Sequence, residues 1–108
     1  MSTVTFEEFK KLDIRVGKII SAERIKRSNK LILLQIDLGG ETRQLVAGLA
    51  PYYSPDELVG KEIVVLANLE PKVFMGYKSQ GMLLAAVVDG KPVLLKPEKE
   101  VPPGAKVS

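Results

Sequence analysis

Two glycine-containing dipeptides, each set between runs of apolar residues, do most to limit what this chain can fold into. Gly39-Gly40 and Asp89-Gly90 both accept the positive φ angles that a two-residue β-hairpin turn requires. The apolar runs around them are short and have the length of strands. The expected strands are residues 14–20, 31–38, 41–47, 62–66 and 82–88, with residues 92–95 returning after the second turn. The sequence therefore predicts an all-β domain of five or more short strands.

Short helices are expected at the N-terminus and between the third and fourth strands. Thr5 and Glu8 have the spacing of a capping box, which predicts a helix that continues to about residue 12. Ser54 followed by Pro55 is typical of a helix start, and this second helix should end near Gly60.

The apolar residues of the expected strands define a candidate core. Gly17 interrupts the first strand and is expected at a bend or bulge. Because successive side chains of a strand point to opposite faces, every second residue of each apolar run is expected to face the core of a barrel. The expected core residues are Phe9, Ile14, Val16, Leu33, Ile36, Val46, Val64, Leu66, Leu83 and Val87.

Residues 68–81 separate the fourth and fifth strands and are too polar for the core of a strand. They hold two glycines, one proline and two lysines. Loops carried on a rigid scaffold often hold binding residues, so this segment is a candidate site. The alternative is an ordinary connection whose Phe74, Met75 and Tyr77 pack into the core.

The net charge of +3 is unevenly placed, because the basic surplus belongs to residues 1–30. The densest part is residues 24–30, which hold Arg24, Lys26, Arg27 and Lys30. Such a cluster is a candidate phosphate-facing patch. The same cluster also fits a solvated strand end and turn.

Composition removes several classes of chemistry. A chain of 108 residues is expected to form one domain. Without histidine or cysteine, the chain cannot form a Ser-His-Asp triad, a Cys-His pair, a thiolate metal site or a disulfide. No apolar run reaches the length of a membrane span. We expect a chain without catalytic activity, cofactor or metal, in the cytoplasm.

Several motifs, in order along nearly the whole chain, resemble those of the tRNA-binding domain family. The longest is Asn68-Leu69-x-Pro71-x-x-x-x-Gly76 followed by Ser79-x-Gly81-Met82. Others are residues 9–19, the apolar alternation of residues 31–39, and Val101-Pro102-Pro103-Gly104. Within that family the chain is most similar to the C-terminal domain, or separate subunit, of methionyl-tRNA synthetases.

The resemblance implies an oligonucleotide-binding (OB) fold, a five-stranded Greek-key barrel. By the family motifs, Ser79, Met82, Asn68 and Arg43 carry over to the tRNA-binding face. Binding RNA also requires cations for phosphates and flat or apolar side chains for bases. The candidate tRNA-binding residues are Lys18, Lys30, Arg43, Asn68, Lys72, Phe74, Lys78, Ser79, Gln80 and Met82.

The expected function is therefore non-catalytic binding of tRNA through its shape and phosphates, which would help a methionyl-tRNA synthetase. The catalytic part of that enzyme, in the same or a separate chain, is an expected partner. The resemblance also implies a homodimer, for which the apolar residues of the tail 92–108 are candidates; the alternative is that the tail only covers the open end of the barrel. The alternative function is a dimerisation or tethering module of a synthetase, with incidental RNA contact.

Overall fold

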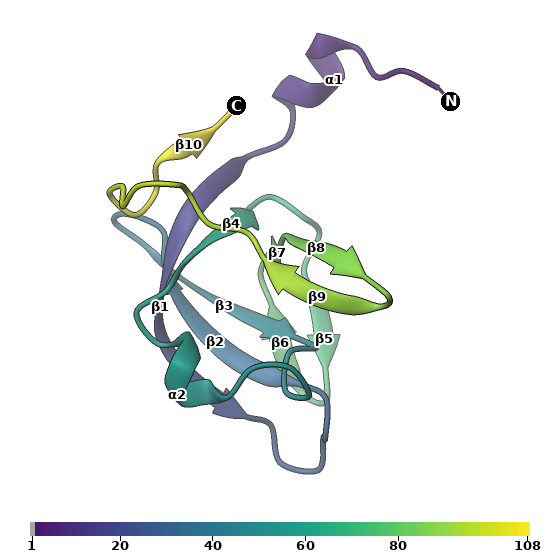
Figure 1. Cartoon of the computed structure of the whole chain (residues 1–108). Coiled ribbons are helices and arrows are strands. Elements are labelled where there is room, and N and C mark those ends of the chain that lie inside the picture. The colour runs from purple at the N-terminus through teal and green to yellow at the C-terminus, as the bar shows by residue number, and fades with distance from the viewer. Residues whose placement is uncertain (1) are drawn as a thin grey trace.

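The computed structural model describes residues 2–108 and confirms the OB-fold barrel (Figure 1). The elements, in chain order, are α1 (Phe6–Lys10), β1 (Ile14–Arg24), β2 (Ile32–Asp37), β3 (Thr42–Ala47), α2 (Pro55–Leu58), β4 (Glu62–Leu66), β5 (Lys72–Phe74), β6 (Tyr77–Ser79), β7 (Met82–Leu83), β8 (Ala85–Val88), β9 (Lys91–Leu94) and β10 (Lys106–Val107). Both helices are far too short to cross a lipid bilayer, and no helix of the described residues can do so.

Five antiparallel strands form the barrel in the order β3-β2-β1-β4-β7. The outer strands of this order, β3 and β7, approach one another, and residues 78–82 close the seam between them. The chain continues from β7 into β8, which leaves the barrel and pairs only with β9. Helix α2 lies between β3 and β4 in sequence, as expected, and packs against β1.

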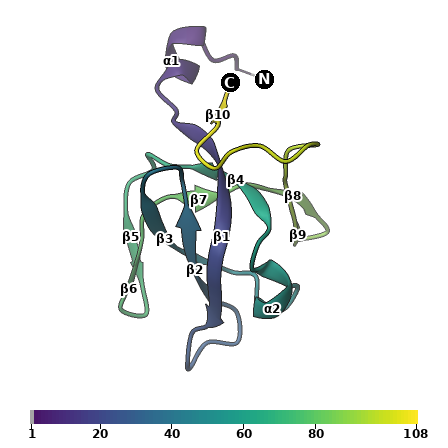
Figure 2. The ribbon, with the colours of Figure 1, turned by 90° about the vertical axis from the view of Figure 1, so that its left-hand side faces the viewer.

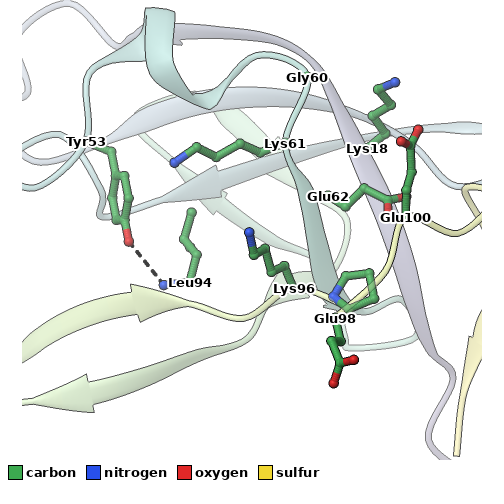
Figure 3. Close-up of a pocket in the computed structure, with 10 residues that line it drawn as sticks. Lys18, Tyr53, Gly60, Lys61, Glu62, Leu94, Lys96, Glu98 and Glu100 are labelled. Carbon is green, nitrogen blue, oxygen red and sulfur yellow. Dashed lines mark hydrogen bonds between the residues drawn. The ribbon is translucent and has the colours of Figure 1, made fainter.

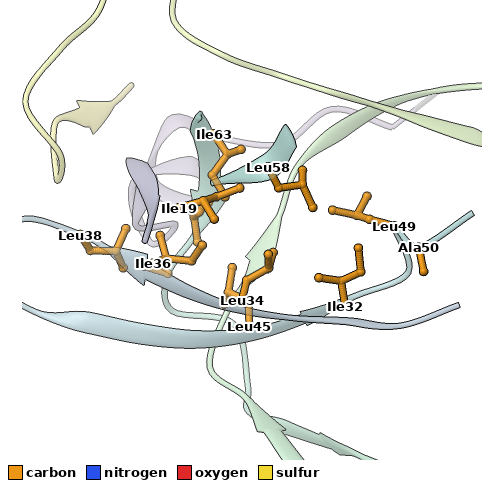
Figure 4. Close-up of a cluster of buried hydrophobic side chains, with 12 residues drawn as sticks. Ile19, Ile32, Leu34, Ile36, Leu38, Leu45, Leu49, Ala50, Leu58 and Ile63 are labelled. Atoms are coloured by element: carbon orange, nitrogen blue, oxygen red, sulfur yellow. The ribbon is translucent and has the colours of Figure 1, made fainter. Parts of the chain in front are cut away.

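The core fills the barrel from Leu38 at one end to Ala50 at the other (Figure 4). Its members are Ile19, Ile32, Leu34, Ile36, Leu38, Leu45, Leu49, Ala50, Leu58, Ile63, Val65 and Ala67. Of the predicted core, Ile36 belongs to this cluster, Leu83 packs against it, and Val16 and Leu33 are buried outside it.

The remaining core predictions were wrong. Strand β3 turns Leu45 inward rather than Val46, and β4 turns Ile63 and Val65 inward rather than Val64 and Leu66. Phe9 and Ile14 are only half-buried, and Val87 is 70% exposed on the β8–β9 hairpin. In β3 and β4 adjacent residues are both apolar, so alternation could not show which of them faces inward.

Gly17 does not form the predicted bulge; the pairing of β1 with β2 shifts between Ile19 and Ser21 instead. At Gly17 the strand passes close to Ile36. A Cβ atom there would lie 2.5 Å from Cγ2 of Ile36. Glycine is therefore needed because the core of β2 packs directly against the β1 backbone.

Both predicted helix starts are confirmed. Thr5 and Glu8 form the full capping box, and Ser54 caps α2 with Pro55 in its first turn. Helix α1 ends at Lys10, earlier than expected. It buries none of its residues and stands beyond the end of the barrel, near both termini (Figure 2).

The polar segment 68–81 is more regular than predicted, because β5 and β6 form a hairpin within it. Met75 and Gly76 make its turn, with φ angles of 49° and 88°. Two consecutive positive φ angles are typical of the type I′ turns that join paired strands. The alternative that Met75 and Tyr77 pack into the core is wrong, since both are exposed.

Candidate nucleic-acid interface

An open groove of about 560 Å³ lies beside the β3–β7 seam. Its residues come from the end of β3, from the β5–β6 hairpin and its approach, and from β7, β8 and β9. Figure 1 shows both hairpins on the same side of the barrel. The lining residues are Val46, Ala47, Gly48, Leu49, Leu69, Glu70, Lys72, Phe74, Ser79, Gly81, Met82, Leu83, Leu84, Ala85, Val87 and Pro92. We call this the Met82 groove.

The β5–β6 hairpin divides the expected loop residues between two faces. Lys72 pairs with Ser79 and Phe74 pairs with Tyr77, whereas Val73 pairs with Lys78 between them. Because side chains alternate along a strand, the first two pairs share one face and Val73 and Lys78 share the other. Lys72, Phe74 and Ser79 line the Met82 groove, and Lys78 does not.

Ser79 is buried, with 5% of its surface exposed. Its hydroxyl accepts a hydrogen bond from the Val46 amide (3.0 Å) and donates one to the Gly81 carbonyl (3.1 Å). The hydroxyl thus makes both of these bonds within the protein, and a contact of Ser79 with tRNA stays a prediction. Its hydroxyl joins β3 to the segment before β7 and supports the floor of the groove.

Arg43 and Gln80 also close the barrel seam. The Arg43 Nη1 atom donates to the carbonyls of Ala67 (2.6 Å) and Gln80 (3.3 Å), and its Nε atom lies 2.9 Å from a Glu41 carboxylate oxygen. The backbone N–H of Gln80 donates a hydrogen bond to the backbone carbonyl of Gln44 at 2.8 Å. The Nη1 and Nε atoms of Arg43 are thus engaged by protein groups.

Asn68 fastens the N-terminal segment to the end of β4. Its Oδ1 atom accepts from the Asp13 amide (2.9 Å), and its Nδ2 atom donates to the Lys11 carbonyl (2.7 Å). Asp13 in turn accepts two hydrogen bonds from the Arg15 guanidinium, which lower the pKa of its carboxyl group. Asn68 is therefore placed as an anchor of the chain, although sequence reasoning assigned it to the ligand face.

Met82 and two lysines remain at the groove. Met82 is 46% exposed and lines it. Lys72 lies at the rim, with Nζ 5.5 Å from the centre of the Phe74 ring. Lys30 approaches from the β1–β2 loop, where a Cβ atom added to Gly48 would lie 3.2 Å from its Cε atom. Lys72 and Met82 thus line the groove, and Lys30 lies against Gly48, another of its lining residues.

Lys18 lies elsewhere, in a second pocket of about 530 Å³ between α2, β1, β4 and the chain after β9 (Figure 3). Lys61 extends over the Tyr53 ring there, at 5.2 Å, and Glu98 points away from the other labelled side chains. The lining holds three lysines (Lys18, Lys61, Lys96) and three glutamates (Glu62, Glu98, Glu100). None of these residues lines the Met82 groove, so Lys18 is not part of that groove.

Sequence reasoning missed several apolar residues of the groove. Leu69 is 42% exposed and Val87 is 70% exposed, and Val46 lies below them on the outer face of β3. Val46 and Val87 had been expected in the core instead. An apolar residue on a hairpin looks the same in sequence whether it is buried or exposed, so no local signal could have found these residues.

Comparison with known proteins agrees with this description. Residues 14–106 match the family model described as "Putative tRNA binding domain". The chain is 59% identical over 104 residues to a methionine–tRNA ligase of Archaeoglobus fulgidus, and 53% identical over 107 residues to that of Pyrococcus furiosus. These matches cover 96% and 99% of the chain but only 16% and 15% of those ligases.

Two solved structures are similar over their whole length. A methionyl-tRNA synthetase-related protein from Pyrococcus horikoshii superimposes with a TM-score of 0.94 at 44% identity, covering 100% of both chains. The chaperone CsaA of Bacillus anthracis gives a TM-score of 0.90 at 37% identity, covering 99% of this chain and 100% of that one. The chain belongs to the tRNA-binding domain family.

Proposed function

We propose that this chain is a non-catalytic tRNA-binding domain that raises the affinity of a methionyl-tRNA synthetase for tRNA. The observation that carries the proposal is the Met82 groove, an apolar surface with Lys72 in its lining and the Lys30 side chain beside Gly48, another lining residue. Lysines supply the attraction to phosphates, and apolar side chains supply contacts to exposed bases. The matching methionine–tRNA ligases support the choice of enzyme, which would place the chain in the cytoplasm.

The domain would act by adding binding free energy rather than chemistry. When a second RNA-binding surface is joined to a catalytic part, the two hold the same tRNA together, and the apparent affinity rises well above that of either alone. Because folded RNA offers few base edges outside its loops, most of this energy would come from shape and backbone contacts.

The first test is electrophoretic retardation of bulk tRNA by this chain at low salt. An unstructured RNA of equal length serves as the control for charge alone. We expect tighter binding of tRNA than of the control. Equal retardation of the two RNAs would mean that the chain attracts RNA only by charge. No retardation would favour the alternative, a tethering module of a synthetase.

The second test measures aminoacylation by a methionyl-tRNA synthetase catalytic part with and without this domain. We expect the domain to lower KM for tRNA with little change in kcat, since it adds binding that is present before and during the chemical step. An unchanged KM would contradict the proposed role even if the isolated chain binds tRNA.

We further propose that the chain forms a homodimer through α1. The end of the tail, Lys106–Val107, pairs with β1 within one chain, whereas Val93 and Leu95 farther back are 49% and 40% exposed. Helix α1 has five residues, buries none of them, and leaves Val4 and Phe6 more than 70% exposed. So short a helix is not stable in water without packing, and a second copy would supply it.

Sedimentation at tens of micromolar tests the dimer. We expect Phe6→Asp to give a monomer, and the exposed Val88→Asp, on the β8–β9 hairpin, to leave the mass of the particle unchanged. A wild-type monomer would refute the pairing. If Phe6→Asp retains tRNA binding at a lower apparent affinity, the dimer contributes avidity.

A further inference from the structure

We propose that the Met82 groove holds one unpaired base of the bound RNA and accepts all four bases. This inference rests on the proposed tRNA-binding function and goes beyond it. Recognition by shape and phosphate alone needs a basic surface, whereas this surface is mostly apolar.

The apolar walls of the groove are left uncovered by the chain itself. Leu69, Met82 and Val87 are 42%, 46% and 70% exposed, and each lines the same hollow. The Phe74 ring, which is half-buried, forms part of its wall. A flat base covers apolar side chains well, and a thioether sulfur makes favourable contacts with an aromatic ring.

The charges at the groove favour a nucleotide over a neutral apolar ligand. Lys72 lies at the end formed by the β5–β6 hairpin, and Lys30 lies beside Gly48 at the end formed by β3. Of the described residues that line the groove, Glu70 is the one acid and Lys72 is the one base. A base with a phosphate on either side presents an apolar centre and two anionic ends, which matches this arrangement.

The polar side chains of the groove offer little means to distinguish bases. The Ser79 hydroxyl is engaged by Val46 and Gly81, so it has no proton to donate to a base edge. Glu70 and Lys72 are exposed. Selective readout depends on fixed donors and acceptors at the base edge, whereas stacking tolerates any base. The groove should therefore bind bases with little sequence preference.

The test compares three RNA probes in fluorescence titrations. One is a fully paired RNA duplex, one is the same duplex with a single bulged nucleotide, and one carries an abasic residue at the bulge. We expect the bulged duplex to bind about tenfold more tightly than the other two, which is the effect of stacking one base. Bulged A, C, G and U should agree within about threefold. A 2-aminopurine at the bulge should change its fluorescence on binding.

Two double variants with the same chemistry separate the groove from the rest of the surface. Met82→Gln/Val87→Ser makes the groove polar, and Met75→Gln/Val88→Ser makes the same changes at residues that are 52% and 56% exposed outside the groove. Val88 follows Val87 on β8, so the pleat directs the two side chains to opposite faces. We expect the first variant to lose most of the tenfold advantage of the bulge and the second to retain it, with melting temperatures close to wild type.

The outcomes separate this inference from the proposed function. If tRNA binds but the bulged, paired and abasic probes bind equally, the inference is overturned and tRNA binding stands. The inference is also overturned if both double variants lose the affinity advantage of the bulged duplex to the same extent. If tRNA does not bind at all, the proposed tRNA-binding function is refuted, and the inference that rests on it is refuted with it. If an extended apolar peptide binds in a manner sensitive to Met82→Gln/Val87→Ser while the bulge has no advantage, the groove is a peptide site instead.

Discussion

The amide of Val46 donates a hydrogen bond of 3.0 Å to the hydroxyl of Ser79, 33 residues later in the chain. In a fully paired sheet a backbone carbonyl would accept this bond. Here a side chain replaces it at the seam between β3 and β7, where the barrel is closed by residues 78–82. The seam also forms the floor of the Met82 groove, so the closure of the fold and the shape of the site depend on the same residue.

Ser79→Ala should therefore destabilise the protein rather than act only on ligand binding. The substitution leaves the Val46 amide without its partner, and an unpaired buried N–H group costs about 1–3 kcal/mol. Urea unfolding measures this loss. Ser21→Ala, at an exposed position on β1, should change the unfolding free energy by less than about 0.5 kcal/mol. If the Ser79→Ala protein has wild-type stability and weakened tRNA binding, the hydroxyl contacts the ligand and its structural role is refuted.

The arrangement of elements could be predicted from the sequence because local signals determine it. The hairpin glycines, the capping box of Thr5 and Glu8, and the Ser54-Pro55 helix start were all placed correctly. Each depends on residues within one turn of chain, where side chains and backbone meet directly.

The inward face of β4 and the roles of the site residues could not be predicted, because they depend on distant partners. Ile63, Val64, Val65 and Leu66 are all apolar, and only pairing with β1 fixes which of them enter the core. Likewise a serine in a polar segment has the same sequence signal whether it meets a ligand or a strand. The hydrogen bonds that Asn68 and Arg43 make within the protein could not be predicted for the same reason.

Gly39→Ala should be more destabilising than Gly40→Ala, although both residues have positive φ angles, of 77° and 90°. Each change costs about 1–2 kcal/mol of backbone strain. At Gly40 a Cβ atom meets nothing, whereas at Gly39 it would collide with the carbonyl oxygen of Pro103. Overpacking should add at least about 1 kcal/mol to the loss at Gly39.

Urea unfolding of the two alanine variants makes this comparison, and hydrogen exchange locates the damage. The Val16 amide bonds the Ala105 carbonyl at 2.9 Å, next to the contact between Gly39 and Pro103. We expect faster exchange at Val16 in Gly39→Ala but not in Gly40→Ala. If the two variants lose equal unfolding free energy, the C-terminal segment around Pro103 moves away from the added methyl group without a loss of stability.

Stability should fall in acid partly through Asp13. The pKa of its carboxyl group is lowered, mainly by the hydrogen bonds from Arg15 and then by the nearby charges of Arg15 and Lys106. Because the folded-state pKa lies below the ordinary value of about 3.9, the stabilisation is present above about pH 4 and is lost as the pH falls through the lowered pKa.

Asp13→Asn should therefore be less stable than wild type at pH 7, by up to about 1 kcal/mol for a pair near the surface. The difference should shrink below about pH 4. Asp89→Asn, in an exposed turn with φ of 51°, is the matched control, since asparagine also accepts that conformation. Urea unfolding between pH 2.5 and 7 measures both. A constant difference between Asp13→Asn and wild type would contradict the assigned cause.

The two lysines of the β5–β6 hairpin should contribute unequally to tRNA binding. Lys72 shares the groove face with Phe74, and Lys78 shares the opposite face with Val73. For wild type, if about four to six phosphates are neutralised, log K should fall with log salt at a slope of roughly −3 to −5. Lys72→Ala should weaken binding to all tRNAs alike and reduce the magnitude of that slope by about 1, because a phosphate contact carries no sequence information.

Lys78→Ala is the matched control, since it removes the same charge from the same hairpin and both side chains are exposed. We expect a smaller loss of affinity and a slope close to wild type, measured by titrations between 50 and about 300 mM salt. Equal effects of the two variants would mean that RNA contacts both faces of the hairpin. If the affinity of the wild-type protein for tRNA does not change with salt, the lysines do not contact phosphates. The groove would then have to bind its ligand without them.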